Sequence, residues 1–322
     1  MKCIEISAPG AADALRVVER PVPQPGAGQV LIRCTASGIN RPDVVQRRGH
    51  YPPPPGASDL PGLEVAGVIS ETGENSAFKP GDRVCALVGG GGYSEKIAVP
   101  EGMVVPIPDE MTMIQAASIP EVWCTVYLNL QLEAGGMKPG EVFFVQAGAS
   151  GIGLAAIQFA KHLGAEVITT VGTPEKAAFV KKFGADYVVN HRTDDLKSVI
   201  AAHPPAVALD CVGGKLMGEC FKNMAFGGRW IMIATLGGGE TAIDLETVWR
   251  KRIRLIGSTL RSRTSEEKSR IMHALHDELF PLFASGKLIS NIHAVFPIRE
   301  VEAAHGVLRR AENIGKVVLT LR

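Results

Sequence analysis

The stretch Glu141-Val-Phe-Phe-Val-Gln-Ala-Gly-Ala-Ser-Gly-Ile-Gly-Leu-Ala-Ala-Ile-Gln-Phe-Ala160 decides the fold of this 322-residue chain. Its first five residues are typical of a buried strand, Gln146–Gly153 form a glycine-rich turn, and an apolar helix is predicted from Leu154 onward. A turn of this kind presents free backbone N–H groups and a positive helix end to a pyrophosphate. Ser150 replaces the middle glycine of the usual G-x-G-x-x-G pattern, so a plain glycine-rich helix start is the alternative.

Beyond this stretch, apolar strands alternate with helices, which is typical of a doubly wound parallel sheet. We predict strands at residues 141–146, 166–171, 187–190, 207–211, 229–234 and 254–258, and helices at 151–163, 174–183, 194–202 and 215–225. Six strands with crossovers make a complete Rossmann fold, which we expect over residues 119–260. The dinucleotide contacts expected at the turn are Gly148, Ser150, Gly151, Ile152 and Gly153.

The first part of the chain, from residue 1 to about 108, reads as short strands separated by Gly and Pro and predicts an all-β module, within a substrate domain that we expect over residues 1–118. The run Pro52–Pro55 can form neither a helix nor a sheet ladder, so we expect an exposed loop over residues 50–59. Residues 261–322 carry helices at 265–284 and 300–311 and a last strand at 316–321. That strand predicts a return to the first module, so the expected fold is α/β, with a Rossmann sheet nested in a β-rich substrate domain.

The end of the second Rossmann strand indicates which nicotinamide cofactor is bound. An NAD site has an acidic residue there, which accepts hydrogen bonds from the ribose hydroxyls. The segment from Thr169 to Pro174 contains no acid, and Lys176 follows in the first helical turn. The Lys176 ammonium with the amides of Gly172 and Thr173 would neutralise a 2′-phosphate, which favours NADPH over NADH. Lys176 as a solvated helix residue is the alternative.

Charge and composition exclude several classes of protein. Lys and Arg total 34 against 33 Asp and Glu, so we expect no nucleic-acid partner. No apolar run approaches eighteen residues and the N-terminus reads as a strand, which predicts neither a membrane span nor a secretory signal. The six cysteines are far apart, without a C-x-x-C pair. A reducing cytoplasm is the expected location.

Ordered motifs along the whole chain resemble the zinc-free, zeta-crystallin-like quinone oxidoreductase branch of the medium-chain dehydrogenase/reductases. The motifs are Gly38-Ile-Asn-Arg-Pro-Asp43, Arg48-Gly-His-Tyr-Pro52, Pro61-Gly-Leu-Glu-Val-Ala-Gly-Val68, Lys79-Pro-Gly-Asp-Arg-Val84 and Ala147–Gly153. Pro53–Ala57, Ser118–Glu121, Gly237–Gly239, Leu260–Arg263 and Asn313–Lys316 are most similar to the tumour-suppressor-inducible NADPH quinone oxidoreductases. The resemblance implies a GroES-like first domain and a homodimer, paired through strand edges near residues 229–234 or 254–259.

Zinc-using members of the superfamily hold their metal on a Cys, a His and a further Cys or acid. The resemblance puts Asn40, Leu63 and Glu121 at or near these three positions, and the four-cysteine lobe is absent. One carboxylate without thiolate or imidazole does not make a zinc site. We therefore expect no metal. A simple ketone needs a Lewis acid, whereas a quinone or enone delocalises the incoming electrons, so the missing ligands favour conjugated acceptors.

The resemblance also transfers roles to single residues. Tyr51, on the Pro-rich loop, is the expected substrate-side donor, with a loop-anchoring aromatic as its alternative. Asn40 is expected to bond the acceptor or the cofactor, with a structural turn amide as its alternative. Thr125 matches a position near the nicotinamide ribose, His191 replaces a tyrosine near the adenosine, and Asn313 lies at a cofactor contact.

These observations predict an NADPH-dependent enzyme that reduces quinones by hydride transfer without zinc. An enoyl or alkenal reductase acting on α,β-unsaturated carbonyls is the nearest alternative, with the same fold and cofactor. An NADPH-binding protein with little turnover and a dehydrogenase of simple alcohols are the further alternatives.

Overall fold

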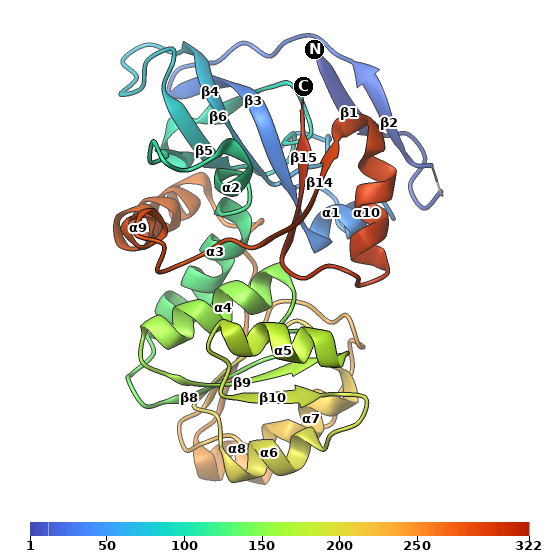
Figure 1. Ribbon diagram of the computed structural model, residues 1–322, viewed down its shortest axis with the longest axis vertical. Helices are drawn as coiled ribbons and strands as arrows, with labels where there is room; N and C mark the ends of the chain where they lie inside the picture. Colours follow the sequence, from blue (N-terminus) through green and yellow to red (C-terminus); the bar gives the residue numbers. More distant parts are fainter. Residues whose placement is uncertain (12, 322) are drawn as a thin grey trace. The chain divides into compact units, whose positions relative to one another are not determined.

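The computed structural model describes residues 1–11 and 13–321 (Figure 1). The chain forms two compact units. The terminal unit combines Met1–Cys124 with Arg261–Arg322, and the central unit is Thr125–Leu260. The boundary between them falls inside helix α3 (Pro120–Tyr127).

The terminal unit is built on a seven-stranded sheet and a two-stranded one. In the large sheet the order is β14-β15-β3-β4-β5-β7, with β6 also paired to β3, and all pairs are antiparallel except β14 with β15. Its strands are β3 (Gln29–Ile39), β4 (Glu64–Thr72), β5 (Arg83–Leu87), β6 (Lys96–Pro100), β7 (Val104–Pro106), β14 (Ile292–Pro297) and β15 (Lys316–Thr320). The small sheet pairs β1 (Lys2–Ile6) with β2 (Leu15–Glu19).

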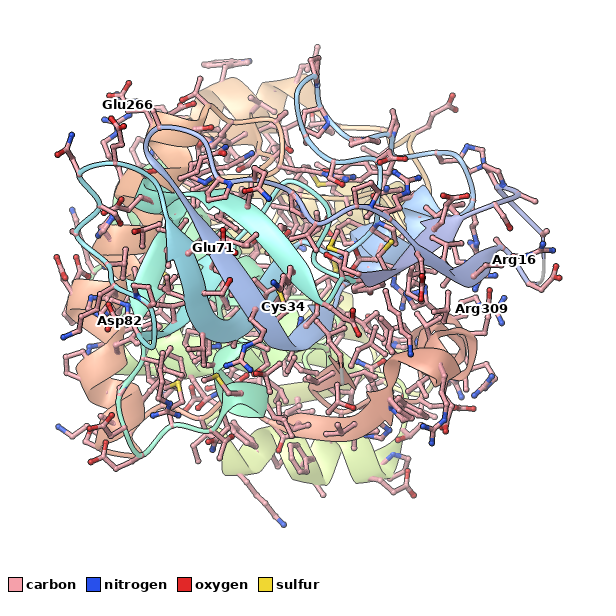
Figure 2. All side chains as sticks on the ribbon, turned by 90° about the horizontal axis from the view of Figure 1, so that it is seen from above. Arg16, Cys34, Glu71, Asp82, Glu266 and Arg309 are labelled. Carbon is pink, nitrogen blue, oxygen red and sulfur yellow. The ribbon has the colours of Figure 1, made fainter. Side chains whose placement is uncertain are left out.

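Short helices connect these strands, and α9 and α10 are the longer helices of the C-terminal part. The helices are α1 (Arg41–Gln46), η1 (Glu101–Met103), α2 (Met113–Ala116), α9 (Ser265–Ala284), η3 (Ile298–Glu300) and α10 (Val301–Arg309). Helix α9 packs against η1 and β7, and α10 packs against β15, β14 and α1. Figure 2 looks onto this unit and shows Cys34 on β3 in the middle of the sheet, with Arg16, Asp82, Glu266 and Arg309 towards its periphery.

The central unit is a parallel six-stranded sheet with the order β10-β9-β8-β11-β12-β13. In chain order within the unit this is 3-2-1-4-5-6, the order of a doubly wound dinucleotide-binding sheet. Its strands are β8 (Val142–Val145), β9 (Glu166–Val171), β10 (Tyr187–Asn190), β11 (Val207–Asp210), β12 (Arg229–Met232) and β13 (Arg254–Gly257). Its helices are η2 (Leu128–Glu133), α4 (Gly151–His162), α5 (Pro174–Lys182), α6 (Leu196–Ala202), α7 (Gly214–Phe221) and α8 (Leu245–Lys251). Its core includes the buried side chains of Phe144, Phe221 and Trp230.

The predicted α/β fold class is confirmed, whereas the all-β interpretation of the first module is wrong at residues 41–46, which form α1. Six residues make fewer than two turns, so no helical periodicity is visible in the sequence. The signal was instead the pair Asn40 and Asp43: the Asp43 carboxylate accepts the Asn40 backbone N–H at 2.8 Å and stabilises the helix start. The Pro-rich segment 50–59 forms neither helix nor strand, as predicted.

Candidate functional site

A buried ion pair lies at the centre of the terminal unit. The Lys316 ammonium is 2.6 Å from Oε1 of Glu64, and the two side chains are 4% and 0% exposed. The ammonium also donates to Oδ1 of Asn40 at 2.6 Å and to the Ile39 carbonyl at 3.2 Å. Nδ2 of Asn40 in turn donates to Oε1 of Glu64 at 2.8 Å. These contacts join β15, β3 and β4 in one cluster, which we call the Asn40–Glu64–Lys316 cluster.

The backbone around Asn40 is shaped for this cluster. A side chain at Gly38 would clash with the Glu64 carboxylate and with the Ala117 carbonyl, so only glycine fits on β3 beneath the carboxylate. Ser37 donates to the Glu64 carbonyl at 2.6 Å. Asp43 receives a second backbone bond, from Gly62 at 3.1 Å. The start of α1 and the chain before β4 are therefore held together by one carboxylate.

Asp43 begins a buried polar chain that leads away from the cluster. Burial raises the pKa of the Asp43 carboxyl from 3.8 to about 6, although hydrogen bonds from the Asn40 and Gly62 amides and from Tyr93 oppose the rise. The Tyr93 hydroxyl also lies 3.1 Å from Nε2 of His305. Burial lowers the pKa of His305 to about 3, aided by the charges of Arg47 and Arg309. His305 is therefore neutral at physiological pH.

Glu121 supplies a third buried carboxyl. Its backbone N–H donates to Oε2 of Glu64 at 2.9 Å. Burial raises the pKa of its side chain from 4.5 to about 8, and the negative charges of Glu64 and Asp43 act in the same direction. The cations of Lys316 and Arg261 oppose the rise. At neutral pH Glu121 therefore carries a proton and is an uncharged hydrogen-bonding group.

Tyr51 is half-buried on the Pro-rich loop, and Arg261 holds it there. The Arg261 guanidinium lies 5.0 Å from the centre of the Tyr51 ring. It also donates to the Tyr51 carbonyl at 3.0 Å, to Gln46 at 2.7 Å and to the Gly89 carbonyl at 3.0 Å. The ring has a packing role through this cation–π contact, and its hydroxyl is a separate chemical group.

The three positions related to zinc ligands have unsuitable donors. Asn40 uses its amide in the Asn40–Glu64–Lys316 cluster, Leu63 is an apolar side chain only 1% exposed, and Glu121 is a carboxyl that holds its proton. These groups do not fit zinc, which prefers thiolate and imidazole. Across residues 1–11 and 13–321, no group of three or more His, Cys, Asp or Glu side chains could hold a metal ion.

The glycine turn of the central unit fits a pyrophosphate. Side chains at Gly148 and Gly153 would clash with Thr169 and with the turn backbone, so the turn is held close to the sheet. Ser150 caps α4, its hydroxyl accepting the Gly153 N–H at 3.0 Å. The N–H groups of Gly151 and Ile152 have no acceptor within their own helix, because they belong to its first turn. They are the natural donors to an anion at this helix end.

A basic group surrounds the end of β9. The Thr173 hydroxyl caps α5 and accepts the Lys176 N–H at 3.3 Å. A methyl group at Gly172 would lie 3.1 Å from Cε1 of His191 and 3.7 Å from Nε of Arg192. Burial lowers the pKa of Lys176, and the neighbouring charge of Arg192 lowers it further. Arg192 was not identified from the sequence, where its only signal was its place after His191 at the end of β10.

Asp210 was also missed. It ends β11 beside the end of β8, where the strand order reverses. Its carboxylate accepts hydrogen bonds from Gln146 Nε2 at 2.9 Å, Val212 N at 2.7 Å, Gly213 N at 3.0 Å and Trp230 Nε1 at 3.1 Å. These bonds fix the two loops that flank the switch point, where doubly wound sheets bind their ligands.

The remaining predicted residues lie outside these clusters. Thr125 is on α3 in the central unit, and its carbonyl accepts a bond from Asn129 at 2.7 Å. Asn313 follows α10 in the terminal unit and donates to the Gly315 carbonyl at 2.8 Å. The structure thus groups Gly148, Ser150–Gly153, Gly172, Thr173, Lys176 and His191 at the carboxyl ends of β8, β9 and β10, and groups Asn40 with Glu121 through Glu64.

Comparison with known proteins agrees with this architecture. The family model described as the alcohol dehydrogenase GroES-like domain matches residues 26–109, and the one described as zinc-binding dehydrogenase matches residues 151–277. The chain is 32% identical to the quinone oxidoreductase of Lama guanicoe and 30% identical to that of Homo sapiens. Both matches cover 100% of the chain and 98% of the relative. None of the described helices is long and apolar enough to cross a membrane.

Solved structures of several enzymes share the fold. Escherichia coli quinone oxidoreductase complexed with NADPH matches with a TM-score of 0.88 and 29% identity, over 99% of this chain and 100% of the other. CurK enoyl reductase matches at 0.85 and 28%, over 99% and 98%, and an NAD-dependent alcohol dehydrogenase at 0.88 and 27%, over 100% of both chains. On the full-length identity to curated relatives, the chain belongs to the medium-chain dehydrogenase/reductase superfamily, in its quinone oxidoreductase branch.

Proposed function

We propose that the protein reduces quinones with hydride from NADPH and without zinc. The observation that carries this proposal is the Asn40–Glu64–Lys316 cluster. At the position of the first zinc ligand, the Asn40 amide bonds an ammonium and a carboxylate of the same chain. The site therefore offers hydrogen bonds in place of a Lewis acid, which favours an acceptor that itself delocalises the incoming charge.

Within this proposal each unit has a separate task. The central unit holds the cofactor, which supplies the hydride. In the terminal unit, residues 1–118 and 261–322 serve as the substrate domain, with Asn40 and the Tyr51 hydroxyl as hydrogen-bond donors to the acceptor oxygen. Thr125, His191 and Asn313 remain proposed cofactor contacts.

An acceptor panel tests the reaction. Purified protein should oxidise NADPH with ortho- and para-quinones at least tenfold faster than with simple ketones, and exhaustive chelation should leave the rate unchanged. A stoichiometric metal whose removal stops turnover contradicts the zinc-free mechanism. The CurK match favours a second candidate, an enoyl or alkenal reductase. That candidate is the better one if alkenals or enones turn over well and quinones do not.

The NADPH preference rests on the basic group at the end of β9. NADPH should bind more tightly than NADH in a fluorescence titration, because Arg192 lies beside Gly172, where a 2′-phosphate is expected, and Lys176 is close enough to Arg192 to feel its charge. Lys176→Ala should reduce the preference by about 1.5–3 kcal/mol, and Arg192→Ala should reduce it as well. Lys181→Ala, at the exposed end of the same helix, is the matched control. Equal affinity of the unmodified protein for both cofactors contradicts the assignment.

The role of Tyr51 is separable from its packing. Tyr51→Phe keeps the ring beneath Arg261 and removes only the hydroxyl, so a donor role predicts a kcat about tenfold to a thousandfold lower with unchanged NADPH affinity. Tyr51→Leu, which loses the ring as well, serves as the control for packing. If Tyr51→Phe keeps the full kcat, the residue only anchors the loop.

A homodimer and a cytoplasmic location complete the proposal. Of the two predicted edges, residues 229–234 are excluded, because β12 is paired on both sides, whereas β13 lies at the edge of the sheet. Leu255 on β13 and Trp249 on α8 are 51% and 66% exposed. Light scattering should show a dimer, and Leu255→Lys should weaken it.

A further inference from the structure

The three donors of the Lys316 ammonium are all used inside the protein. An ammonium has three N–H groups and no acceptor, and its three partners are the Ile39 carbonyl, Oδ1 of Asn40 and Oε1 of Glu64. Its side chain is 4% exposed. Lys316 therefore has no donor left for a substrate, and any effect that it has on the reaction must pass through one of these partners.

Two of these contacts fix the orientation of the Asn40 amide. The atom that faces the ammonium must be the amide oxygen, because an ammonium cannot accept a hydrogen bond. The atom that faces the Glu64 carboxylate must be the amide nitrogen, because a carboxylate cannot donate one. Both conditions agree with the observed contacts, Oδ1 to Lys316 and Nδ2 to Glu64. A flipped amide would make two repulsive contacts in place of two charge-assisted bonds.

The fixed amide has one N–H group left over. Nδ2 has two hydrogens, and Glu64 accepts one of them. Within residues 1–11 and 13–321, the bond to Glu64 is the only hydrogen bond that Nδ2 of Asn40 donates. The residue is nearly but not fully buried, at 6% exposure. The remaining N–H is thus a donor that the protein itself does not use.

We propose that Lys316, together with Glu64, is a positioning residue that makes Asn40 a one-way hydrogen-bond donor to the carbonyl oxygen of the acceptor. This inference rests on the proposed function and adds the direction of the hydrogen bond, from Asn40 to the acceptor. A one-way donor binds a carbonyl oxygen, and binds it more strongly as negative charge develops there. It does not accept a bond from a hydroxyl hydrogen. Buried ion pairs are often no more stabilising than apolar side chains, and the orientation of Asn40 gives this pair a use other than stability.

A double-mutant cycle tests whether Lys316 acts through Asn40. Because Lys316→Met alone leaves an unpaired buried carboxylate, the variant is the double substitution Glu64→Gln/Lys316→Met, which removes both charges. In the Asn40 protein it should lower kcat at least tenfold while leaving the KM for NADPH unchanged. In the Asn40→Ala background the same double substitution should lower kcat less than threefold. Equal losses in the two backgrounds contradict a positioning role.

The matched control is the partly buried ion pair between Arg229 and Glu141 of the central unit, with nitrogen and oxygen 2.5 Å apart. Glu141→Gln/Arg229→Met should lower stability and show no coupling to Asn40→Ala in kcat. Coupling of the same size there would make the effect a general consequence of destabilisation, and would overturn the inference.

A second measurement does not depend on turnover. The side-chain amide signals of Asn40 can be identified by NMR as the pair lost in Asn40→Ala. In Glu64→Gln/Lys316→Met these signals should shift and broaden, because the amide is released, and unchanged signals overturn the inference. If the unmodified protein turns over no conjugated carbonyl compound, the proposed function fails, and the amide signals still decide whether Lys316 orients Asn40.

Discussion

Each unit buries a carboxylate that ties several segments together, but the two carboxylates are neutralised in different ways. Asp210 in the central unit receives four hydrogen bonds, and all four donors are neutral. Glu64 in the terminal unit is bonded to the Lys316 ammonium, the Asn40 amide and the Glu121 N–H. Neutral dipoles are therefore enough to hold one buried carboxylate that has a structural task.

The terminal unit needs the cation because it buries more acid. Asp43, Glu64 and Glu121 are all buried. The charges of Glu64 and Asp43 add to the effect of burial in raising the pKa of Glu121, and the charge of Lys316 lowers the pKa values of Asp43 and Glu121. Lys316 bonds only Glu64 among the three carboxyls. Burial first, and then the excess of carboxyls over bonded cations, explain why Glu121 keeps its proton. Burial also raises the pKa of Asp210, and there the four hydrogen bonds alone oppose the rise.

The largest expected effect comes from removing the cation of the Asn40–Glu64–Lys316 cluster. Lys316→Met leaves the Glu64 charge buried and unpaired, which should lower the free energy of unfolding by about 3–5 kcal/mol. Glu64→Gln/Lys316→Met should recover most of this loss, since no buried charge remains. Urea denaturation measures both. If Lys316→Met alone is as stable as the unmodified protein, the ion pair is not needed to bury Glu64.

The pH dependence of stability depends on Glu121. Its pKa is about 8 in the folded protein and 4.5 ordinarily, so the folded state binds the proton more tightly. The resulting stability is fully present below pH 4.5 and is lost as the pH rises towards 8. Glu121→Gln should remove this loss, on the order of 3 kcal/mol between pH 5 and pH 8.

The charged groups that interact electrostatically with the Glu121 carboxyl lie on several elements. They are Glu64 on β4, Asp43 on α1, Lys316 on β15, Lys268 on α9, and Arg261. A smaller slope below pH 6 should persist in Glu121→Gln, because the Asp43 pKa is also raised. Glu110→Gln, at an exposed carboxyl, is the matched control. An unchanged slope in Glu121→Gln would show that Glu121 is ionised in the folded protein at neutral pH.

The sequence was most informative where the pattern is local. The glycine turn and the strands on either side of it predicted the central sheet, and helix α9 was predicted with its observed bounds, 265–284. Short elements such as α1 and β14 (Ile292–Pro297) were missed, because they contain too few residues to show a period. Tertiary contacts, and not propensity, determine such elements.

The candidate site was less predictable, because its contacts join residues far apart in the chain. Asn40 and Glu121 were identified by resemblance, but Glu64 and Lys316 were not. Lys316 is 252 residues from Glu64, and it reaches the cluster only because β15 pairs with β3, with Val317 opposite Ile39. The available signal was that two apolar strands each begin with a charged residue, β4 with Glu64 and β15 with Lys316. Both charged residues are buried in the structure.

Removing the charge of Asp210 in the central unit should lower the free energy of unfolding less than removing Lys316 from the Asn40–Glu64–Lys316 cluster. Asp210→Asn replaces one oxygen by an NH2 group, which would face a donor such as Trp230 Nε1. We expect a loss of about 1–3 kcal/mol, together with weaker NADPH binding, because Asp210 fixes the loops at the switch point. Thermal unfolding and fluorescence titration measure the two effects. A loss as large as that of Lys316→Met would remove the distinction between the two carboxylates.

The smallest expected effect concerns the polar chain from Asp43 to His305. Tyr93 donates to the Asp43 carboxylate, so its oxygen must accept from Nε2–H of His305. This assigns the tautomer of His305 and leaves Nδ1 as a bare lone pair, which has no hydrogen-bond partner among the described residues. Tyr93→Phe removes the hydroxyl between Asp43 and His305 and should lower the free energy of unfolding by about 1–2 kcal/mol. Since the Tyr93 bond lowers the pKa of Asp43, that pKa should rise and the loss should grow as the pH increases above 6. His305→Phe removes the ring nitrogens but keeps the bond from Tyr93 to Asp43, so its loss should not grow in this range. The same pH dependence in both variants would mean that Tyr93 does not bond Asp43, and that the carboxylate is held by the Asn40 and Gly62 amides alone.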